Sequence, residues 1–231
     1  MKKILFIGNS HTYMNDMPEL ARQMMENATG EACEVFMLAN PGKPLKWHME
    51  EDYYSVRFNV LYGKYDYCVI QEQAHPLPPE EDTVESIARL IDLCKKANIA
   101  PVIFETWAEK RKPENQDEMN RRYRKLAREY GAILAPVGEV WEKTLADLND
   151  QSEYDLYFRD GEHASAVGDY LAAMVTVKAI TGKMPLKGFR RAFDFTIPGE
   201  NKVRATENIS DEELQLPEMI VEIIRDNVEK Y

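Results

Sequence analysis

Short apolar runs alternate with longer segments of helical spacing between residues 3 and 181. Segments 18–27, 84–97, 114–130, 137–148 and 165–181 have the spacing or the charge of helices, whereas runs 3–7, 33–39, 65–70, 100–105 and 132–135 are short and largely apolar. The short runs predict strands that are covered on both faces. Strands separated by helices of this length predict a parallel sheet with right-handed crossovers. We therefore expect a three-layer α/β/α sandwich, flavodoxin-like and doubly wound, with about five strands.

This alternation stops near residue 183. Residues 187–204 mix basic and aromatic side chains, and residues 210–231 have the pattern of an acidic amphipathic helix. We expect one α/β domain over 1–182, and an extension over 183–231 that packs on this domain or on a second subunit of a homo-oligomer. The pair Arg190-Arg191 is interpreted as solvated surface rather than an anion site. The apolar side of the predicted helix consists of Met219, Ile220, Ile223 and Ile224.

The net charge of the chain argues against two classes of binding partner, nucleic acids and anionic membranes. Its 231 residues suit one α/β domain, and the formal net charge is −11. An acidic protein offers no basic face for the phosphates of a nucleic acid, and it is poorly suited to an anionic membrane surface. A small-molecule substrate is the partner that fits best.

The N-terminus and the cysteines favour an ordinary cytoplasmic protein. The apolar run before Gly8 is too short for the roughly 7–15 apolar residues of a secretory signal. No run approaches the ~20 apolar residues of a membrane span. Cys33, Cys68 and Cys94 are odd in number and widely spaced, so we expect buried, reduced thiols rather than a disulfide framework or a zinc site.

Candidate chemistry follows the predicted strands, because ligands of open parallel sheets bind at the carboxyl ends of the strands. The first strand runs into Gly8 and then Ser10. The glycine permits a tight turn that lifts Ser10 clear of the sheet. A serine so placed can attack a carbonyl, and its own N–H can help to hold the resulting oxyanion.

A base for this serine is predicted on the loop before the last helix of the domain. Asp160 precedes His163 by three residues. An imidazole can remove the proton of a serine hydroxyl at neutral pH, and a carboxylate fixes its tautomer and stabilises the imidazolium. This spacing lets both side chains meet on one loop, and we expect Ser10, Asp160 and His163 to converge.

Two further strand ends carry candidate oxyanion donors. The turn Asn40-Pro41-Gly42 follows the second strand, where Gly42 lets the backbone approach a substrate and offer its N–H. After the third strand, the side-chain amide of Gln73 can donate an N–H to an oxyanion. Each of these segments alone is equally compatible with an ordinary polar turn, and their coincidence at successive strand ends makes them informative.

Taken together, these segments resemble the SGNH, or GDSL-like, family of serine hydrolases. The first block of that family, Gly-Asp-Ser-x-Thr after the first strand, is matched by Gly8-Asn9-Ser10-His11-Thr12. Its last block, Asp-x-x-His-Pro-Ser-x-x-Gly, is matched by Asp160-Gly161-Glu162-His163-Ala164-Ser165-Ala166-Val167-Gly168. The resemblance covers roughly residues 3–181 and implies that the protein is a serine esterase.

The resemblance also implies a role for each matched residue. Ser10 would be the nucleophile, His163 the base and Asp160 the residue that orients it. The oxyanion hole would comprise the N–H groups of Ser10 and Gly42 and the amide of Gln73. Three positions depart from the family pattern: Asn9 replaces Asp, Ala164 replaces Pro, and Gln73 replaces an Asn in a block that normally reads Gly-x-Asn-Asp.

The substrate is predicted only by class. Aromatic side chains near the strand ends favour a small acyl ester, such as an O-acetyl group on a carbohydrate whose ring could stack on them, although the same side chains suit any acyl pocket or the core. The absence of a long apolar lid argues against triglyceride lipase activity. The predicted pocket residues are His11, Tyr13, Trp47, His75 and Trp107.

Three competing interpretations have weaker support. His11, His75 and His163 could converge with Asp160 on a metal, but no His-Glu-x-x-His spacing is present. A flavin or nucleotide site would require the glycine-rich loops that the chain lacks. A binding protein that kept the fold without catalysis remains an alternative. We expect no metal and no cofactor.

Overall fold

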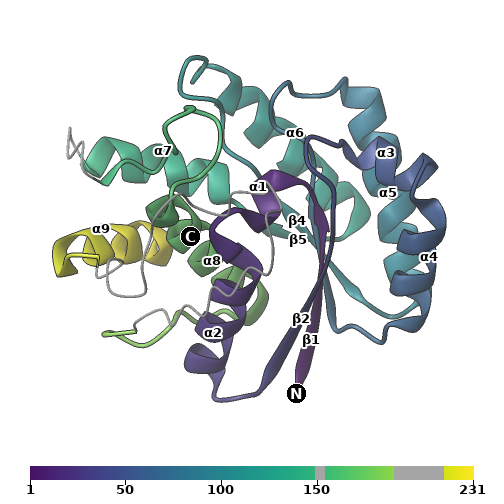
Figure 1. Cartoon of the computed structure of the whole chain (residues 1–231), viewed down its shortest axis with the longest axis horizontal. Coiled ribbons are helices and arrows are strands. Elements are labelled where there is room, and N and C mark those ends of the chain that lie inside the picture. The colour runs from purple at the N-terminus through teal and green to yellow at the C-terminus, as the bar shows by residue number, and fades with distance from the viewer. Residues whose placement is uncertain (149–153, 190–215) are drawn as a thin grey trace, which may run out of the picture.

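The computed structural model describes residues 1–148, 154–189 and 216–231. Within these residues, five strands form one parallel sheet in the order β2-β1-β3-β4-β5. The sheet lies between two layers of helices (Figure 1). Its strands are β1 (Lys2–Gly8), β2 (Cys33–Ala39), β3 (Tyr67–Gln71), β4 (Ala100–Phe104) and β5 (Ile133–Ala135).

Helices cover both faces of the sheet. On one face lie α2 (Met17–Thr29), α7 (Val137–Leu148), α8 (Ala166–Thr181) and α9 (Glu218–Glu229). On the other lie α3 (Leu45–Glu50), α4 (Tyr53–Tyr62), α5 (Glu80–Lys96) and α6 (Asn115–Tyr130). The short helix α1 (Ser10–Tyr13) and a 3₁₀ turn, η1 (Met14–Asp16), follow β1 directly.

The alternation of side chains along β1 divides the interior into two cores. Ile4 and Phe6 pack toward α2 and α8, whereas Leu5 and Ile7 pack toward α3 and α5, and all four are buried. Successive residues of a strand point to opposite faces, so a strand between two helical layers must be apolar at every position. Burial of each such side chain contributes about 1.5–3 kcal/mol.

The predicted fold class is confirmed, and the main differences concern helices on one face. Neither α3 nor α4 is anticipated by the spacing of apolar residues. In α4 the apolar side chains lie all round the helix, and Tyr54, Phe58 and Tyr62 are exposed. A helix without a single apolar side gives no periodic signal, because that signal arises from one-sided burial.

The C-terminal helix is shorter than predicted and packs on the rest of the chain. Ile220 and Ile224 of α9 are buried in the core that α7 and α8 share, while Met219, which the sequence places on the apolar side, is half exposed. The division at residue 182 therefore stays a prediction. Arg190-Arg191 and residues 210–215 lie outside the described residues.

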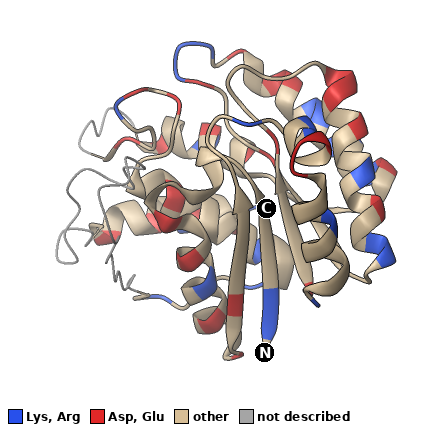
Figure 2. Cartoon of the chain, turned by 45° about the vertical axis from the view of Figure 1, so that its right-hand side comes forward, with Lys and Arg blue, Asp and Glu red and all other residues tan. Residues whose placement is uncertain are grey.

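Charged side chains lie mainly on the helices and loops, and the central part of each strand is free of them (Figure 2). Cys33, Cys68 and Cys94 are buried and free, as predicted. None of the described helices has both the length and the apolar character needed to cross a bilayer.

Candidate functional site

The strand order defines the edge at which a site is expected. From β1 the chain passes to β2 on one side and then to β3 on the other, so the order reverses between β1 and β3. The carboxyl ends of parallel strands on either side of such a reversal form the usual binding crevice of open α/β sheets. The register pairs Gly8 with Ala39 and Ile7 with Ile70, which brings the loops after β1, β2 and β3 to the same edge.

Gly8 is required at the end of β1 by close packing. A Cβ atom at this position would lie 2.4 Å from both Gln71 Oε1 and Thr12 Oγ1. The same glutamine oxygen accepts hydrogen bonds from the Asn9 N–H at 2.9 Å and from the Thr12 hydroxyl at 2.8 Å. The turn into Ser10 is therefore fixed by the side chain of Gln71, which the sequence did not identify.

Asn9 has a structural role that explains its departure from the family pattern. Its Oδ1 accepts from the His11 N–H at 3.1 Å and so caps α1. Its Nδ2 donates to the Lys43 carbonyl at 3.2 Å, in the turn that contains Gly42. A carboxylate could make the first contact but not the second, because it has no N–H to donate.

The loop before α8 is ordered by its own backbone. The Phe158 N–H donates to the His163 carbonyl at 2.8 Å, and the Gly161 N–H donates to the Phe158 carbonyl at 2.9 Å. Gly161 has a φ of +72°, which favours glycine. Ser165 then caps α8 by accepting from the N–H groups of Val167 and Gly168. The side chain of His163 is thereby held on a short, internally bonded segment.

The three predicted side chains meet at this edge. Ser10 Oγ lies 2.8 Å from His163 Nε2, although 153 positions separate the two residues. On the other side of the imidazole, His163 Nδ1 lies 2.8 Å from Asp160 Oδ2. With the proton on Nδ1, the imidazole donates to the carboxylate and accepts from the hydroxyl, which is the arrangement that activates a serine.

The carboxylate of Asp160 is held in its ionised form. Partial burial raises its pKa, but hydrogen bonds from the Glu162 N–H, from the His163 ring and from the His163 N–H outweigh burial, so the pKa lies below its ordinary value. Oδ1 accepts both backbone N–H groups at 2.9 Å. Asp160 therefore remains a negative acceptor for the imidazole at neutral pH.

The loop after β4 supports the segment that carries His163. Trp107 donates its indole N–H to the Glu162 carbonyl at 2.8 Å, and the Lys110 N–H donates to the Gly161 carbonyl at 2.8 Å. From the opposite side, Asn15 Nδ2 donates to the Ala164 carbonyl at 3.1 Å. Both flanks of the segment are thus fixed by residues distant in sequence.

His11 and His75 gather around the imidazole of His163. The His11 ring stacks on His163 with centroids 4.6 Å apart, and its other neighbours are His75 at 5.2 Å and Trp107 at 5.4 Å. Burial, then the neighbouring His163 and His75, holds the pKa of His11 well below its ordinary value. Burial likewise lowers the pKa of His75 to about 4. Both rings are therefore neutral at neutral pH.

These histidines converge, as the metal interpretation required, but they contact one another through their rings. Among the residues that the structure describes, no group of three or more His, Cys, Asp or Glu side chains is arranged to hold a metal ion.

The candidate oxyanion donors lie on the loops after β2 and β3. Gly42 has a φ of +63° and is exposed, at the turn closed by the Lys43 N–H donating to the Asn40 carbonyl. Gln73 Nε2 donates to the His75 carbonyl at 3.1 Å, which leaves its second N–H for another acceptor. The sequence missed Glu72, a buried carboxylate between these loops whose only signal is a charge directly after an apolar strand.

The three other predicted pocket residues differ in their exposure. Tyr13 and Trp47 are partly exposed near the strand ends, and Lys43 Nζ lies 5.5 Å from the Trp47 ring. Trp107 is fully buried and stacks on Trp141 at 4.1 Å, so it belongs to the core and is not a pocket wall. The sequence left both interpretations open for Trp107, and its stacking on Trp141 of α7 favours the core.

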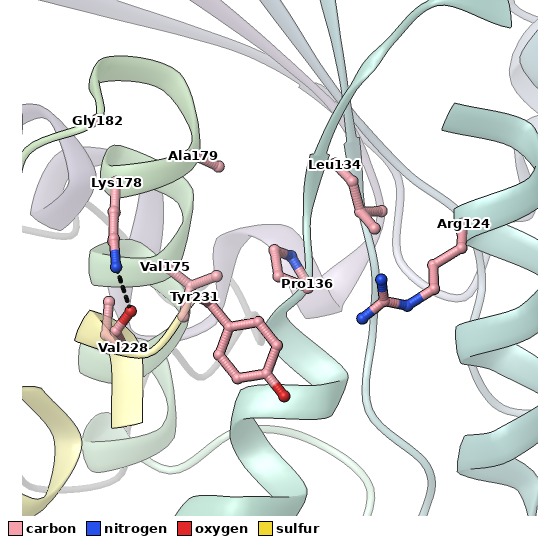
Figure 3. Close-up of a pocket in the computed structure, with 9 residues that line it drawn as sticks. All are labelled: Arg124, Leu134, Pro136, Val175, Lys178, Ala179, Gly182, Val228 and Tyr231. Atoms are coloured by element: carbon pink, nitrogen blue, oxygen red, sulfur yellow. Dashed lines mark hydrogen bonds between the residues drawn. The ribbon is translucent and has the colours of Figure 1, made fainter. Parts of the chain in front are cut away.

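A separate cavity of about 390 Å³ lies between α6, α8 and the C-terminal segment (Figure 3). Its two cations already have partners: Arg124 pairs with Glu139, while Lys178 donates to the carbonyls of Val228 and Glu229. None of the predicted site residues lines it.

Comparison with solved structures identifies the fold. The chain is similar to a candidate SGNH hydrolase from Slackia heliotrinireducens, with 27% identity, a TM-score of 0.63, and coverage of 78% of this chain and 98% of that one. It is also similar to a catalytic mutant of an acetylxylan esterase from Geobacillus stearothermophilus, with 13% identity, a TM-score of 0.63, and coverage of 78% and 94%.

A third similar structure is a psychrotrophic esterase from Pseudoalteromonas inhibited by monoethylphosphonate, with 12% identity, a TM-score of 0.59, and coverage of 79% and 98%. No protein-family model matches the chain, and no protein with a curated description does. The resemblance to SGNH hydrolases that the two sequence blocks indicate is confirmed.

Proposed function

We propose that this chain, which has the SGNH-hydrolase fold, is a serine esterase that forms an acyl-enzyme on Ser10. The observation that carries the proposal is the pair of 2.8 Å contacts that joins the hydroxyl of Ser10 to the carboxylate of Asp160 through the imidazole of His163. A binding protein would not need a serine so placed, since the contacts serve to remove its proton.

In the proposed reaction, Ser10 Oγ attacks the ester carbonyl while His163 Nε2 accepts the hydroxyl proton. The negative charge on the carbonyl oxygen is held by the N–H groups of Ser10 and Gly42 and by the amide of Gln73. His163 then protonates the departing alcohol. A water molecule attacks the acyl-enzyme by the same path and releases the acid.

For the substrate, we propose a small acyl ester, with O-acetylated carbohydrates as the first class to test. The support is that acetylxylan and acetyl-xylooligosaccharide esterases share this fold, and that the partly exposed Trp47 lies five residues beyond Gly42, where a sugar ring could stack. The corresponding measurement is release of acetate from acetylated xylooligosaccharides, compared with hydrolysis of acetyl and octanoyl nitrophenyl esters.

The decisive test of the mechanism does not require the substrate. A fluorophosphonate reacts with an activated serine, and an esterase of this fold is inhibited by a phosphonate. We expect one adduct per chain on Ser10, located by mass spectrometry, and none in Ser10→Ala. Ser55→Ala is the matched control, because Ser55 is exposed on α4 and has no imidazole partner. Labelling of Ser55, or of no residue, would contradict the proposal.

A further inference from the structure

Glu72 is a buried carboxylate with an unusual position. It follows β3 directly, its side chain is 1% exposed, and no step of the proposed reaction uses it. Transfer of a charged group out of water costs several kcal/mol unless partners compensate for it. The contacts that compensate here come from the next residue of its own loop and from the first residue of α3, which follows the loop of Gly42.

One oxygen of Glu72 joins the loops that carry the candidate oxyanion donors. Oε1 accepts from the Leu45 N–H at 2.9 Å and from the Gln73 N–H at 2.7 Å. Leu45 lies three residues after Gly42, and Gln73 is itself the other candidate donor. A carboxylate that accepts two backbone N–H groups at one atom fixes their separation, and with it the positions of the groups attached to them.

We propose that Glu72 is a positioning residue for the oxyanion hole: its ionised carboxylate holds the loops of Gly42 and Gln73 at the separation that the transition state requires. This inference rests on the proposed function. In this role the buried carboxylate of Glu72 orders the oxyanion hole without contacting the reacting atoms.

The surroundings of Glu72 make its charge sensitive to pH. Burial raises the pKa of Glu72 to about 7. Its other neighbours oppose this shift, because they favour the ionised form: the two backbone N–H groups, the guanidinium of Arg122 on α6 and the hydroxyl of Thr83 on α5. Tyr123 on α6 is another titratable neighbour, and the pKa of its buried hydroxyl is raised by both Glu72 and Glu105. Arg122 donates to the Pro78 carbonyl at 2.7 Å and pairs with Glu118 at 3.3 Å, which holds its guanidinium in place.

Protonation weakens Glu72 as an acceptor, because a neutral carboxyl group holds an N–H less strongly than a carboxylate does. The wild-type enzyme should therefore lose part of its oxyanion stabilisation as the pH falls through about 7. Glu72→Gln keeps the acceptor oxygen but cannot ionise, so it should resemble protonated wild type at every pH.

The test is the ratio of wild-type to Glu72→Gln kcat for a nitrophenyl acetate. We expect about 10 at pH 8.5 and about 1 at pH 5.5, with KM changed less than about threefold. Glu105→Gln is the matched control, since Glu105 is also buried at a strand end but accepts from the Glu139 N–H of α7. Its ratio should stay near 1 throughout. A purely structural role for Glu72 would lower the rate equally at all pH values, and such a flat ratio would overturn the inference.

A second measurement needs neither catalysis nor a folded variant. In the ¹⁵N–¹H spectrum of the wild-type protein, the amides of Leu45 and Gln73 should titrate together with a midpoint near pH 7. Amides that do not titrate together would overturn the inference. If Ser10 is not labelled while these amides titrate, the proposed function fails and the positioning of the loops by Glu72 stands. If Ser10 is labelled and the rate ratio is flat, the proposed function stands and the positioning role of Glu72 fails.

Discussion

The two halves of the candidate site are organised by different means. Asp160 and His163 lie three residues apart, and the carboxylate of Asp160 bonds only to backbone and imidazole of its own loop. Gly42 and Gln73 lie on separate loops that meet through the buried Glu72. The acid–base half is thus local in sequence and its aspartate is partly exposed, whereas the oxyanion half depends on long-range contacts and a buried charge.

Because of this difference, the two halves should respond differently to single substitutions. A local, hydrogen-bonded loop retains its geometry when one side chain is changed, so substitutions there should remove chemistry without unfolding the protein. A half assembled from two loops can be displaced by a change that touches neither donor. Three substitutions test this contrast, in order of decreasing effect, and a fourth, outside both halves, gives a reference for a buried carboxylate.

The largest effect is expected for His163→Ala. Loss of the base should lower kcat for nitrophenyl acetate by about 10⁴-fold or more, because His163 Nε2 is the group in contact with Ser10 Oγ that would accept its proton. Thermal stability should change little, since the side chain is partly exposed. The control is the double variant with Ser10→Ala, which should be no slower than either single variant. A loss of less than tenfold would remove His163 from the role of base.

A smaller loss is expected for Asp160→Asn. The new Oδ1 can still accept from the N–H groups of Glu162 and His163, so the loop keeps its shape, but Nδ2 cannot accept from the imidazole. Loss of the correct tautomer should lower kcat by about 10³-fold, somewhat less than the ~10⁴ known for a buried carboxylate. An equally active Asn variant would show that the local half does not depend on the charge of Asp160.

Gln73→Ala tests the distributed half. Removal of one oxyanion donor typically lowers kcat by ~10²–10³-fold, and we expect about 10² here with KM nearly unchanged. The bond from Gln73 Nε2 to the His75 carbonyl is lost as well, so thermal unfolding should be recorded alongside the kinetics. An effect below about threefold would exclude Gln73 as a donor, and Gly42 would then act with the Ser10 N–H alone.

The smallest effect concerns stability rather than rate. Burial, then the neighbouring Glu139, raises the pKa of Glu105 to about 8 from an ordinary 4.5. The folded state therefore binds a proton that the unfolded state releases, so this contribution to stability is complete below pH 4.5 and is lost as the pH rises through about 8. Relative to wild type, Glu105→Gln should gain on the order of 1–3 kcal/mol between pH 5 and 9. Denaturant unfolding curves that keep a constant difference would contradict this.

Much of this arrangement could be predicted from the sequence because it depends on local signals. The apolar runs identify all five strands, and the spacing of Asp160 and His163 indicates the acid–base loop. The helix α4 escapes prediction because its apolar residues have no single side.

The residues that order the site from a distance could not be predicted, since their roles depend on contacts that form only in the folded chain. Gln71 and Glu72 read as the start of a polar loop, yet each is almost fully buried and each holds backbone from another segment. The core position of Trp107 likewise depends on Trp141, which is distant in sequence.

The stacked indoles of Trp107 and Trp141 provide a built-in optical reporter. The chain has three tryptophans, and two of them form this pair. The indole N–H of Trp107 donates to the carbonyl of Glu162, the residue before His163. Any displacement of that backbone alters the polarity around an indole whose emission is otherwise that of a dry, ring-stacked environment. We therefore expect a ligand that displaces this backbone to change the intrinsic fluorescence, with no dye attached.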